Sequence, residues 1–581
     1  MTTVFSLAEA ERMLHRTVDL HEFASTIVLR CQLQHLRYTL VTGHCFETAK
    51  AEYHLLRDFL VSCEKTQDLG RFPPMRDLVP KEVDFPRVIA LLELIARDRI
   101  RRDFASVGSI ALCADSYRNV GGRDVIGVTA HRLDANFNLH SAVIGVKEAD
   151  FSQTGGAIAG RIRETANGMF PQPTMMISSI VTDHAANYAA AGRLITEDSI
   201  GCAARLLQLV VHDVCGKKLP EMHELLKSVS SFTVSIRQRK GSLRVMDQMR
   251  VAKGEKPLRP VSNVSTRWNS DFLMVVRYLT LAKDYRATTA SLGAGDVEQP
   301  PQATSKDLRL YARYMRPLFV ATEQLSADEC PTLCQVPSVV WRLHQEVAAL
   351  KSCELKDSLL RSIRTRLMPV LETPSLALMA AIVAPYYSDL ESLHVRQDVQ
   401  VQVLDKIALL ARELERVNTG KDVGPRALEV IRKVLDVMAA DFKGMSVEEK
   451  KQWKNPLAYW KAEGNQKMYA MILPVVRLLL AIPASSTPVE RLFSVFTYIH
   501  SKRRVRLRTS VASKSVFIAS NMGPTQPPIT DDEVQRLQEM LDAEAATSPV
   551  VIDELEEIDE ENSVPDAEEV TAAEGVDDSL E

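Results

Sequence analysis

Pro483 to Ser494 reads PASSTPVERLFS and predicts the start of a buried helix with one acid on its first turn. Thr487 is a good N-cap, Pro488 suits the first helical position, and Glu490 stands three residues after the cap, as in a capping box. The apolar residues that follow have the spacing of a core-facing helix: Val489, Leu492, Phe493 and Phe496. Glu490 can therefore be a cap or a metal ligand, and the second role requires partner carboxylates elsewhere.

Upstream of this helix, the chain contains short β-branched runs separated by turn-like segments. They predict three strands joined by hairpins, at residues 109–114, 125–130 and 140–146. A helix from TGGAIAGRIRETANGM, a fourth strand at 175–182 and another helix follow. This order is typical of a ribonuclease H-like α+β fold with a mixed sheet, whose ligand site lies at strand ends.

Two aspartates follow predicted strands. Asp115 comes directly after the first strand and Asp183 directly after the fourth, so we expect both acids at one sheet edge, with Glu490 as a third. Mg²⁺ and similar hard ions take oxygen ligands, and two such ions can activate water for phosphodiester cleavage. The alternatives are a turn residue for Asp115 and a helix N-cap for Asp183.

Composition restricts the class of protein. The chain of 581 residues is 46% hydrophobic and 25% charged, as in globular proteins, and shows neither a secretory signal nor a transmembrane run. Its nine cysteines at irregular spacing favour reduced thiols, and Cys330, Cys334 and His344 are expected to be structural.

Charge is distributed unevenly along the chain. The net charge is −4, but residues 551–581 hold fourteen acids and no Lys or Arg, which leaves 71 bases against 61 acids elsewhere. A basic body with an acidic tail is common in proteins that meet nucleic acid. The tail can equally be a solvated, disordered end.

Several segments resemble the hAT (hobo/Activator) transposase superfamily. NPLAYWK, LLLAIPASSTPVERLFSVFTYIHSKRRVRLR and VFIASNM are similar, in order, to the C-terminal dimerisation region of that family. STRWNSDFLMVVRYL, VTDHAANYAAA and ALMAAIVAPYYSDL resemble upstream family motifs. The resemblance spans about residues 105–522.

The resemblance implies five regions along the chain. They are an N-terminal helical region without a BED zinc finger (1–105), the first part of a ribonuclease H-like core (106–220), a large all-helical insertion (221–450), the dimerisation region that completes the core (451–522), and an acidic, mostly disordered tail with a short helix near 531–543 (523–581).

The resemblance also implies an activity. Asp115, Asp183 and Glu490 would bind two Mg²⁺ or Mn²⁺ ions for hydrolysis at transposon ends and strand transfer to target DNA. The chain would act in the nucleus and self-associate through residues 453–522 as a homodimer or larger oligomer. Arg267 and Trp268 match a family pair whose ring stacks on a flipped base. Alternatively, Trp268 is a core aromatic beside Phe272 and Val275 on an amphipathic helix.

Two positions depart from the family pattern. Tyr117 stands where the family usually has Trp. Cys202 matches the Cys of a Cys-x-x-His motif, but Arg205 replaces its His; Arg can bind a phosphate but cannot titrate near neutrality. This departure favours a second function, a domesticated and catalytically inactive DNA-binding, dimerising nuclear protein.

DNA recognition without a zinc finger would rest on basic segments. RQRK at 237–240 and KRRVRLR at 502–508, which includes Lys502, Arg503 and Arg504, are the candidates. Such runs can also be plain solvated faces. Cys31, His35, His44 and Cys45 lack the paired spacing of a finger and are expected to be core residues. A third function, an unrelated ribonuclease H-like nuclease, would not need the apolar helices of 453–522.

Overall fold

The computed structural model describes residues 85–105, 108–119, 121–171, 175–263, 268–292, 305–419, 425–500, 509–523 and 526–547, with part of 30–37. Most of the predicted N-terminal helical region, all four of Cys31, His35, His44 and Cys45, and the acidic tail lie outside these residues. Within them, no helix is long and apolar enough to cross a membrane.

The elements follow the predicted order through the sheet and are helical afterwards. The strands are β1 (Ser109–Arg118), β2 (Asp124–Leu133), β3 (Leu139–Glu148), β4 (Met176–Thr182) and β5 (Ser199–Gly201). The helices that precede or border the sheet are α4 (Phe85–Phe104), α5 (Gly155–Met169), α6 (Ala186–Ile195), α7 (Ala203–Val211), α21 (Leu473–Ala481), α22 (Thr487–Ile499), α23 (Thr509–Asn521) and α24 (Asp531–Thr547).

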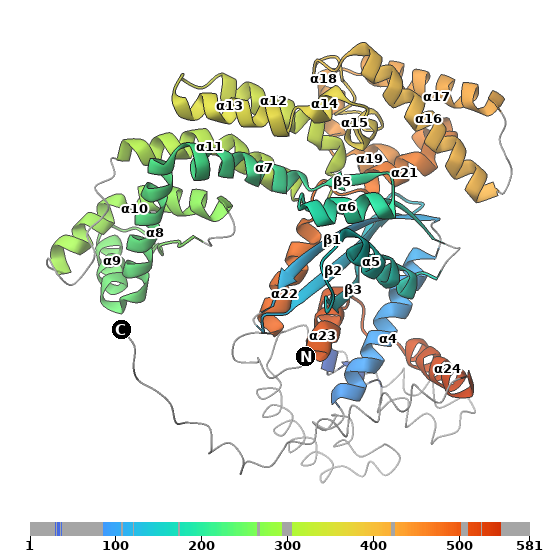
Figure 1. Cartoon of the computed structure of the whole chain (residues 1–581), viewed down its shortest axis with the longest axis horizontal. Helices are drawn as coiled ribbons and strands as arrows, with labels where there is room; N and C mark the ends of the chain where they lie inside the picture. The colour runs from blue at the N-terminus through green and yellow to red at the C-terminus, as the bar shows by residue number, and fades with distance from the viewer. Residues whose placement is uncertain are drawn as a thin grey trace, which may run out of the picture.

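The remaining helices lie in sequence between the sheet and α21. They are η3 (His212–Lys218), α8 (Pro220–Gln238), α9 (Lys240–Ala252), α10 (Trp268–Leu292), α11 (Ser305–Leu325), η4 (Leu333–Gln335), α12 (Val336–Ala348), α13 (Glu354–Arg366), α14 (Pro369–Glu372), α15 (Leu376–Ile382), α16 (Gln397–Thr419), α17 (Pro425–Gly444), α18 (Val447–Gln452), α19 (Pro456–Lys461), α20 (Glu463–Met468) and η5 (Ala470–Ile472). Figure 1 shows these helices spread beyond one end of the sheet.

The five strands form one mixed sheet in the order β3-β2-β1-β4-β5. β1, β2 and β3 are antiparallel, as the predicted hairpins require, whereas β4 and β5 run parallel to β1 and β4 respectively. The four predicted strands and the mixed α+β class are confirmed. β5 was not predicted because three residues are too short for a recognisable alternation.

Helices cover both faces of this sheet, and two glycines mark where they approach most closely. A Cβ on Gly127 would lie 2.8 Å from Leu492 and 2.9 Å from Val489 of α22, and one on Gly145 would lie 2.2 Å from Thr165 of α5. Gly145 pairs with Val128, the neighbour of Gly127, so the two glycines face opposite sides. Helix α22 therefore lies on one face and α5 on the other.

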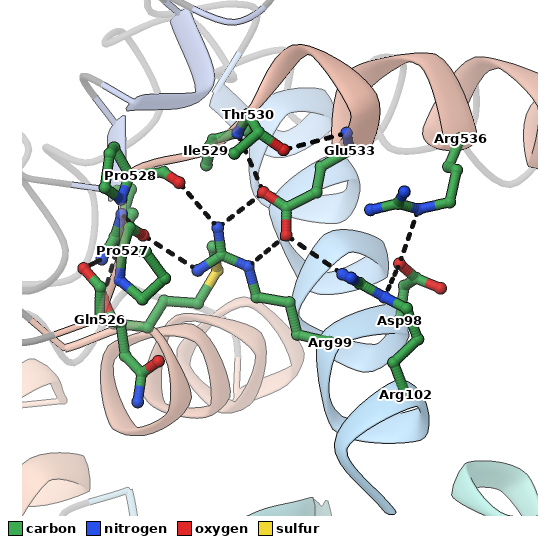
Figure 2. Close-up of polar contacts among 12 residues, drawn as sticks. Asp98, Arg99, Arg102, Gln526, Pro527, Pro528, Ile529, Thr530, Glu533 and Arg536 are labelled. Carbon is green, nitrogen blue, oxygen red and sulfur yellow. Dashed lines mark hydrogen bonds and ion pairs between the residues drawn. The ribbon is translucent and has the colours of Figure 1, made fainter. Parts of the chain in front are cut away.

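The C-terminal helix α24 is fixed to α4 by ion pairs (Figure 2). Arg99 binds both carboxylate oxygens of Glu533, at 2.6 and 2.7 Å, and Arg102 donates to the same group at 3.2 Å. Arg37 adds four bonds to the carbonyl groups of Met522, Gly523, Gln526 and Pro527. We call these residues the C-terminal clamp. The short helix predicted near 531–543 is confirmed by α24, and the clamp explains why this helix lies against α4.

Candidate functional site

Asp115 lies inside β1 rather than after it. The strand continues to Arg118, and Asp115 pairs with Gly127 of β2, so the prediction of a strand-end or turn residue is wrong. Cross-strand partners point to the same face, which places the Asp115 side chain on the side covered by α22. Its carboxylate accepts a hydrogen bond from the Ser116 backbone N–H at 2.7 Å.

Asp183 directly follows β4, as predicted. β4 is the parallel neighbour of β1, and Thr182 is in register with Ala114, so the next residue on each strand is an aspartate. The Asp183 carboxylate accepts a bond from the backbone N–H of Ala185 at 2.9 Å. It is not the N-cap of α6, because that position is Ala185. The two aspartates therefore lie at matching positions of the neighbouring parallel strands β1 and β4.

Glu490 lies on the first turn of α22, but the predicted capping box is not formed. The helix begins at Thr487, its N-cap is Ser486, and no side chain caps it. The Thr487 hydroxyl is instead hydrogen bonded to that of Ser485. The predicted capping box between Thr487 and Glu490 is therefore wrong.

Sulfur atoms hold the loop before α22 in place. Cys202, fully buried at the N-cap of α7, accepts hydrogen bonds at 3.3 Å from the backbone N–H groups of Ser486 and Arg205. Cys113 on β1 contacts the Ser485 carbonyl at 3.8 Å. Cys202 therefore joins both motifs, PASSTPVERLFS and the first turn of α7. Arg205 on that turn is exposed and donates to Gln208 at 2.7 Å.

The acids interact through their charges. The pKa of Asp115 is raised to about 7, chiefly by burial, then by the charge of Asp183 and, less, by that of Glu490; the Ser116 N–H and the charge of Arg205 act in the opposite direction. Charged groups from three other segments, up to 375 positions away in sequence, therefore act on the Asp115 carboxyl. Three carboxylates against one guanidinium leave an excess of negative charge that a divalent cation would relieve.

Carboxylates are the ligands that a hard divalent ion prefers. The structure does not group the three carboxylates around one metal position. No group of three His, Cys, Asp or Glu within the described ranges is close enough to hold a metal.

Three further residues shape this site, and sequence reasoning had pointed only to Tyr117. Gly127 has no Cβ, which permits α22 to pack against β2 opposite Asp115. Tyr188 of α6 is buried, and the nearby charges of Asp115 and Asp183, after burial, help to raise the pKa of its hydroxyl. Tyr117 stacks on Phe493 at 5.3 Å and binds Thr497 at 2.8 Å, so Tyr117 helps to hold α22 against β1.

The predicted DNA-contacting residues are described only in part. Arg267, Lys502, Arg503 and Arg504 lie outside the described residues. Trp268 begins α10 and is 8% exposed, packed in the core with Phe272 and Val275 nearby on the same helix. This burial favours the alternative of a core aromatic; stacking on a base would require the ring to move.

Comparisons with known proteins support the family resemblance. Residues 440–522 match the model of the hAT family C-terminal dimerisation region, which confirms the resemblance at PASSTPVERLFS. The chain is also 21% identical, over 583 aligned residues, to "Putative transcriptional regulator tpeD" of Talaromyces stipitatus. The alignment covers 86% of this chain and 66% of that relative, so this chain spans just under two thirds of the relative's length.

Proposed function

We propose that this chain, a hAT-type protein by its dimerisation region, is a metal-dependent DNA transposase that cuts transposon ends and joins them to target DNA in the nucleus. Its main support is that Asp115 and Asp183 occupy matching positions at neighbouring strands β1 and β4, and that the charges of Asp183 and Glu490 act on the Asp115 carboxyl although the three acids lie far apart in sequence. The strand order β3-β2-β1-β4-β5, with the first three strands antiparallel, is that expected of a ribonuclease H-like core, interrupted by the helices between α7 and α19.

Each residue has a distinct part in this proposal. Asp115, Asp183 and Glu490 would hold two Mg²⁺ or Mn²⁺ ions, which supply an activated water and stabilise the leaving oxygen of the phosphodiester. Asp115 must lose its proton to serve as a ligand, which its raised pKa makes sensitive to pH near neutrality. Arg205 is exposed beside these acids, where its guanidinium can bind a phosphate oxygen. Self-association would use residues 453–522.

The test is cleavage of DNA that carries the ends of the cognate element. Wild-type protein is expected to cut with Mg²⁺ or Mn²⁺, whereas Asp115→Asn, Asp183→Asn and Glu490→Gln lose cutting and keep DNA binding. Asp398→Asn, which changes an exposed acid on α16 outside the self-associating residues, is the matched control and should cut normally. Failure of the wild type to cut cognate ends would refute the enzymatic proposal for this chain.

A second candidate is a domesticated protein that binds DNA and dimerises without catalysis. This candidate is favoured by Arg205, which stands where the family has His. The name of the relative from Talaromyces stipitatus, a transcriptional regulator, is compatible with it. In that case the acid substitutions leave every DNA-dependent readout unchanged. Light scattering of the full chain tests what both candidates share, because a monomer at micromolar concentration would contradict self-association.

A further inference from the structure

A small cavity lies at the end of the sheet opposite the acids. It is bordered by the start of β1 and β4, the end of β2, and α21, and has a volume of about 140 Å³. A water needs ~10–15 Å³ of such space, so the cavity admits a larger group. Ser109 on its wall is six residues before Asp115 on the same strand, which is ~20 Å away at ~3.3 Å per residue.

Two arginines that border this cavity have unused donors. Arg132 at the end of β2 is 4% exposed, yet its Nε and Nη1 atoms are buried without a hydrogen-bond partner. Arg477 of α21 has a buried, unpartnered Nε, while its Nη2 donates to the Ala135 carbonyl at 3.3 Å. Neither guanidinium forms an ion pair within 4 Å among the described residues. A buried donor without a partner has lost its hydrogen bonds to water without replacement, so both arginines would gain from a ligand that accepts hydrogen bonds.

Each of the two arginines lies over an aromatic ring. Arg132 lies over the ring of Phe104 at 5.0 Å and Arg477 over that of Phe137 at 5.1 Å, so each guanidinium is fixed by a ring face rather than by an acid. Burial lowers the pKa of both, but Arg remains charged at any pH of interest.

The other charged groups nearby do not fill the cavity. Asp134 favours the charged form of both arginines, and Asp103 that of Arg132. The Asp134 carboxylate is occupied by Asn136, Asn138 and His140, and these bonds overcome its burial and lower its pKa to about 2. His131 on the wall is neutral, because burial lowers its pKa to about 4.

We infer that Arg132 and Arg477 form a binding site for one small oxyanion, a phosphate group, remote from the acids and independent of the proposed function. Both arginines line the same cavity of about 140 Å³, each has a buried donor without a partner, and the planar fork of a guanidinium matches phosphate oxygens. The phosphate belongs either to a free small molecule or to a nucleic-acid backbone.

Calorimetric titration of the full-length chain with inorganic phosphate at constant ionic strength tests the site. The wild type should bind one phosphate, and its Tm should rise by ~1–3 °C at tenfold excess over Kd. Arg132→Met and Arg477→Met should weaken binding at least tenfold. Arg161→Met is the matched control, because Arg161 also lies over a ring, that of Phe151, but is paired with Asp150.

A stability measurement separates binding from a structural role. In phosphate-free buffer Arg132→Met should be as stable as the wild type or more so, because it removes unsatisfied donors. The inference would be overturned if Arg132→Met had a lower Tm than the wild type and phosphate still raised that Tm by the wild-type amount. It would also be overturned if the wild type showed no saturable binding of phosphate. If phosphate competes with DNA for binding to the wild type but not to Arg132→Met, the site takes a phosphate of the nucleic-acid backbone. If neither Arg132→Met nor Arg477→Met changes DNA binding, the site takes a free anion.

Discussion

Two shielded carboxylates, Asp115 beside α22 and Glu533 in the C-terminal clamp, have pKa values that shift in opposite directions. Burial raises both, but Asp115 adds the charges of Asp183 and Glu490 and reaches about 7. Glu533 gains hydrogen bonds from Arg99, from the Thr530 N–H and from Arg102, which outweigh burial and lower its pKa to about 2. One region is built from unlike charges and is stabilised by them; the other gathers like charges and is destabilised by them. A pKa raised by burial and by like charges is common among the residues of functional sites.

Glu533→Gln should give the largest loss of stability. It leaves Arg99, 12% exposed at its side chain, without its bidentate partner, so the free energy of unfolding should fall by ~3 kcal/mol at pH 7. The folded pKa is lowered, so this stability is present above the unfolded value of 4.5 and is lost as pH falls toward 2. Urea denaturation at pH 7 and pH 3 measures the difference.

The control for this change is Glu539→Gln, an exposed acid on the same helix that accepts only a 3.4 Å bond from Gln535. It should change stability by less than ~0.5 kcal/mol. Equal losses of unfolding free energy in Glu533→Gln and Glu539→Gln would show that the ion pairs of the C-terminal clamp do not stabilise the fold.

Asp115→Asn should act in the opposite direction. With EDTA at pH 8 we expect a gain of ~2 kcal/mol in the free energy of unfolding, because a charge opposed by burial, Asp183 and Glu490 is removed. The folded pKa is raised, so the wild-type carboxyl stabilises the fold below 3.8 and this contribution is lost as pH rises through about 7. The gain should therefore disappear at pH 4.

Asp124→Asn is the control for the loss of an aspartate from this sheet. Asp124 faces Arg118 at 3.8 Å, so this variant should be slightly less stable than the wild type. A loss of stability for Asp115→Asn at pH 8 would contradict the reading of Asp115 as a destabilising charge.

Gly127→Ala tests whether α22 must press against β2. The added Cβ would lie within 3.0 Å of three side chains of α22, so we expect a loss of ~1–2 kcal/mol by thermal or urea unfolding. Gly156→Ala in α5, where nothing lies within 4 Å, should instead gain ~0.5–1 kcal/mol. Similar values for both would show that α22 tolerates displacement from Gly127.

Cys202→Ala should have the smallest effect, ~1 kcal/mol, because it removes the acceptor for the N–H groups of Ser486 and Arg205. Cys202→Ser keeps an acceptor there and should lose less. If Ala and Ser behave alike in urea unfolding, the sulfur serves packing rather than hydrogen bonding.

The sequence predicted the sheet better than the details of the site. Alternating runs identified four strands, and strand-end logic brought Asp115 and Asp183 together even though Asp115 proved to lie inside β1. The polar end of that strand, DSYR, hides its pairing with β2. The cap at Thr487 failed because the chain enters α22 one residue earlier, with Ser486 at the N-cap.

Other features could not be predicted because they join distant segments. The clamp joins Arg99 to Glu533, 434 positions apart, and no local pattern marks either residue. Gly127 reads as an ordinary strand glycine until α22 is seen against it. Arg132 is a single basic residue at the end of a strand, and only its burial without partners distinguishes it from a surface arginine.

Calorimetric titration of the metal-free chain with Mn²⁺ tests the central claim, that three acids from distant segments form one cation site. The wild type should bind Mn²⁺ with an affinity that increases as pH rises through about 7, where Asp115 loses its proton, and Asp115→Asn and Glu490→Gln should each weaken binding at least tenfold. Equal Mn²⁺ affinity in the wild type and both variants, or no binding by the wild type, would contradict it.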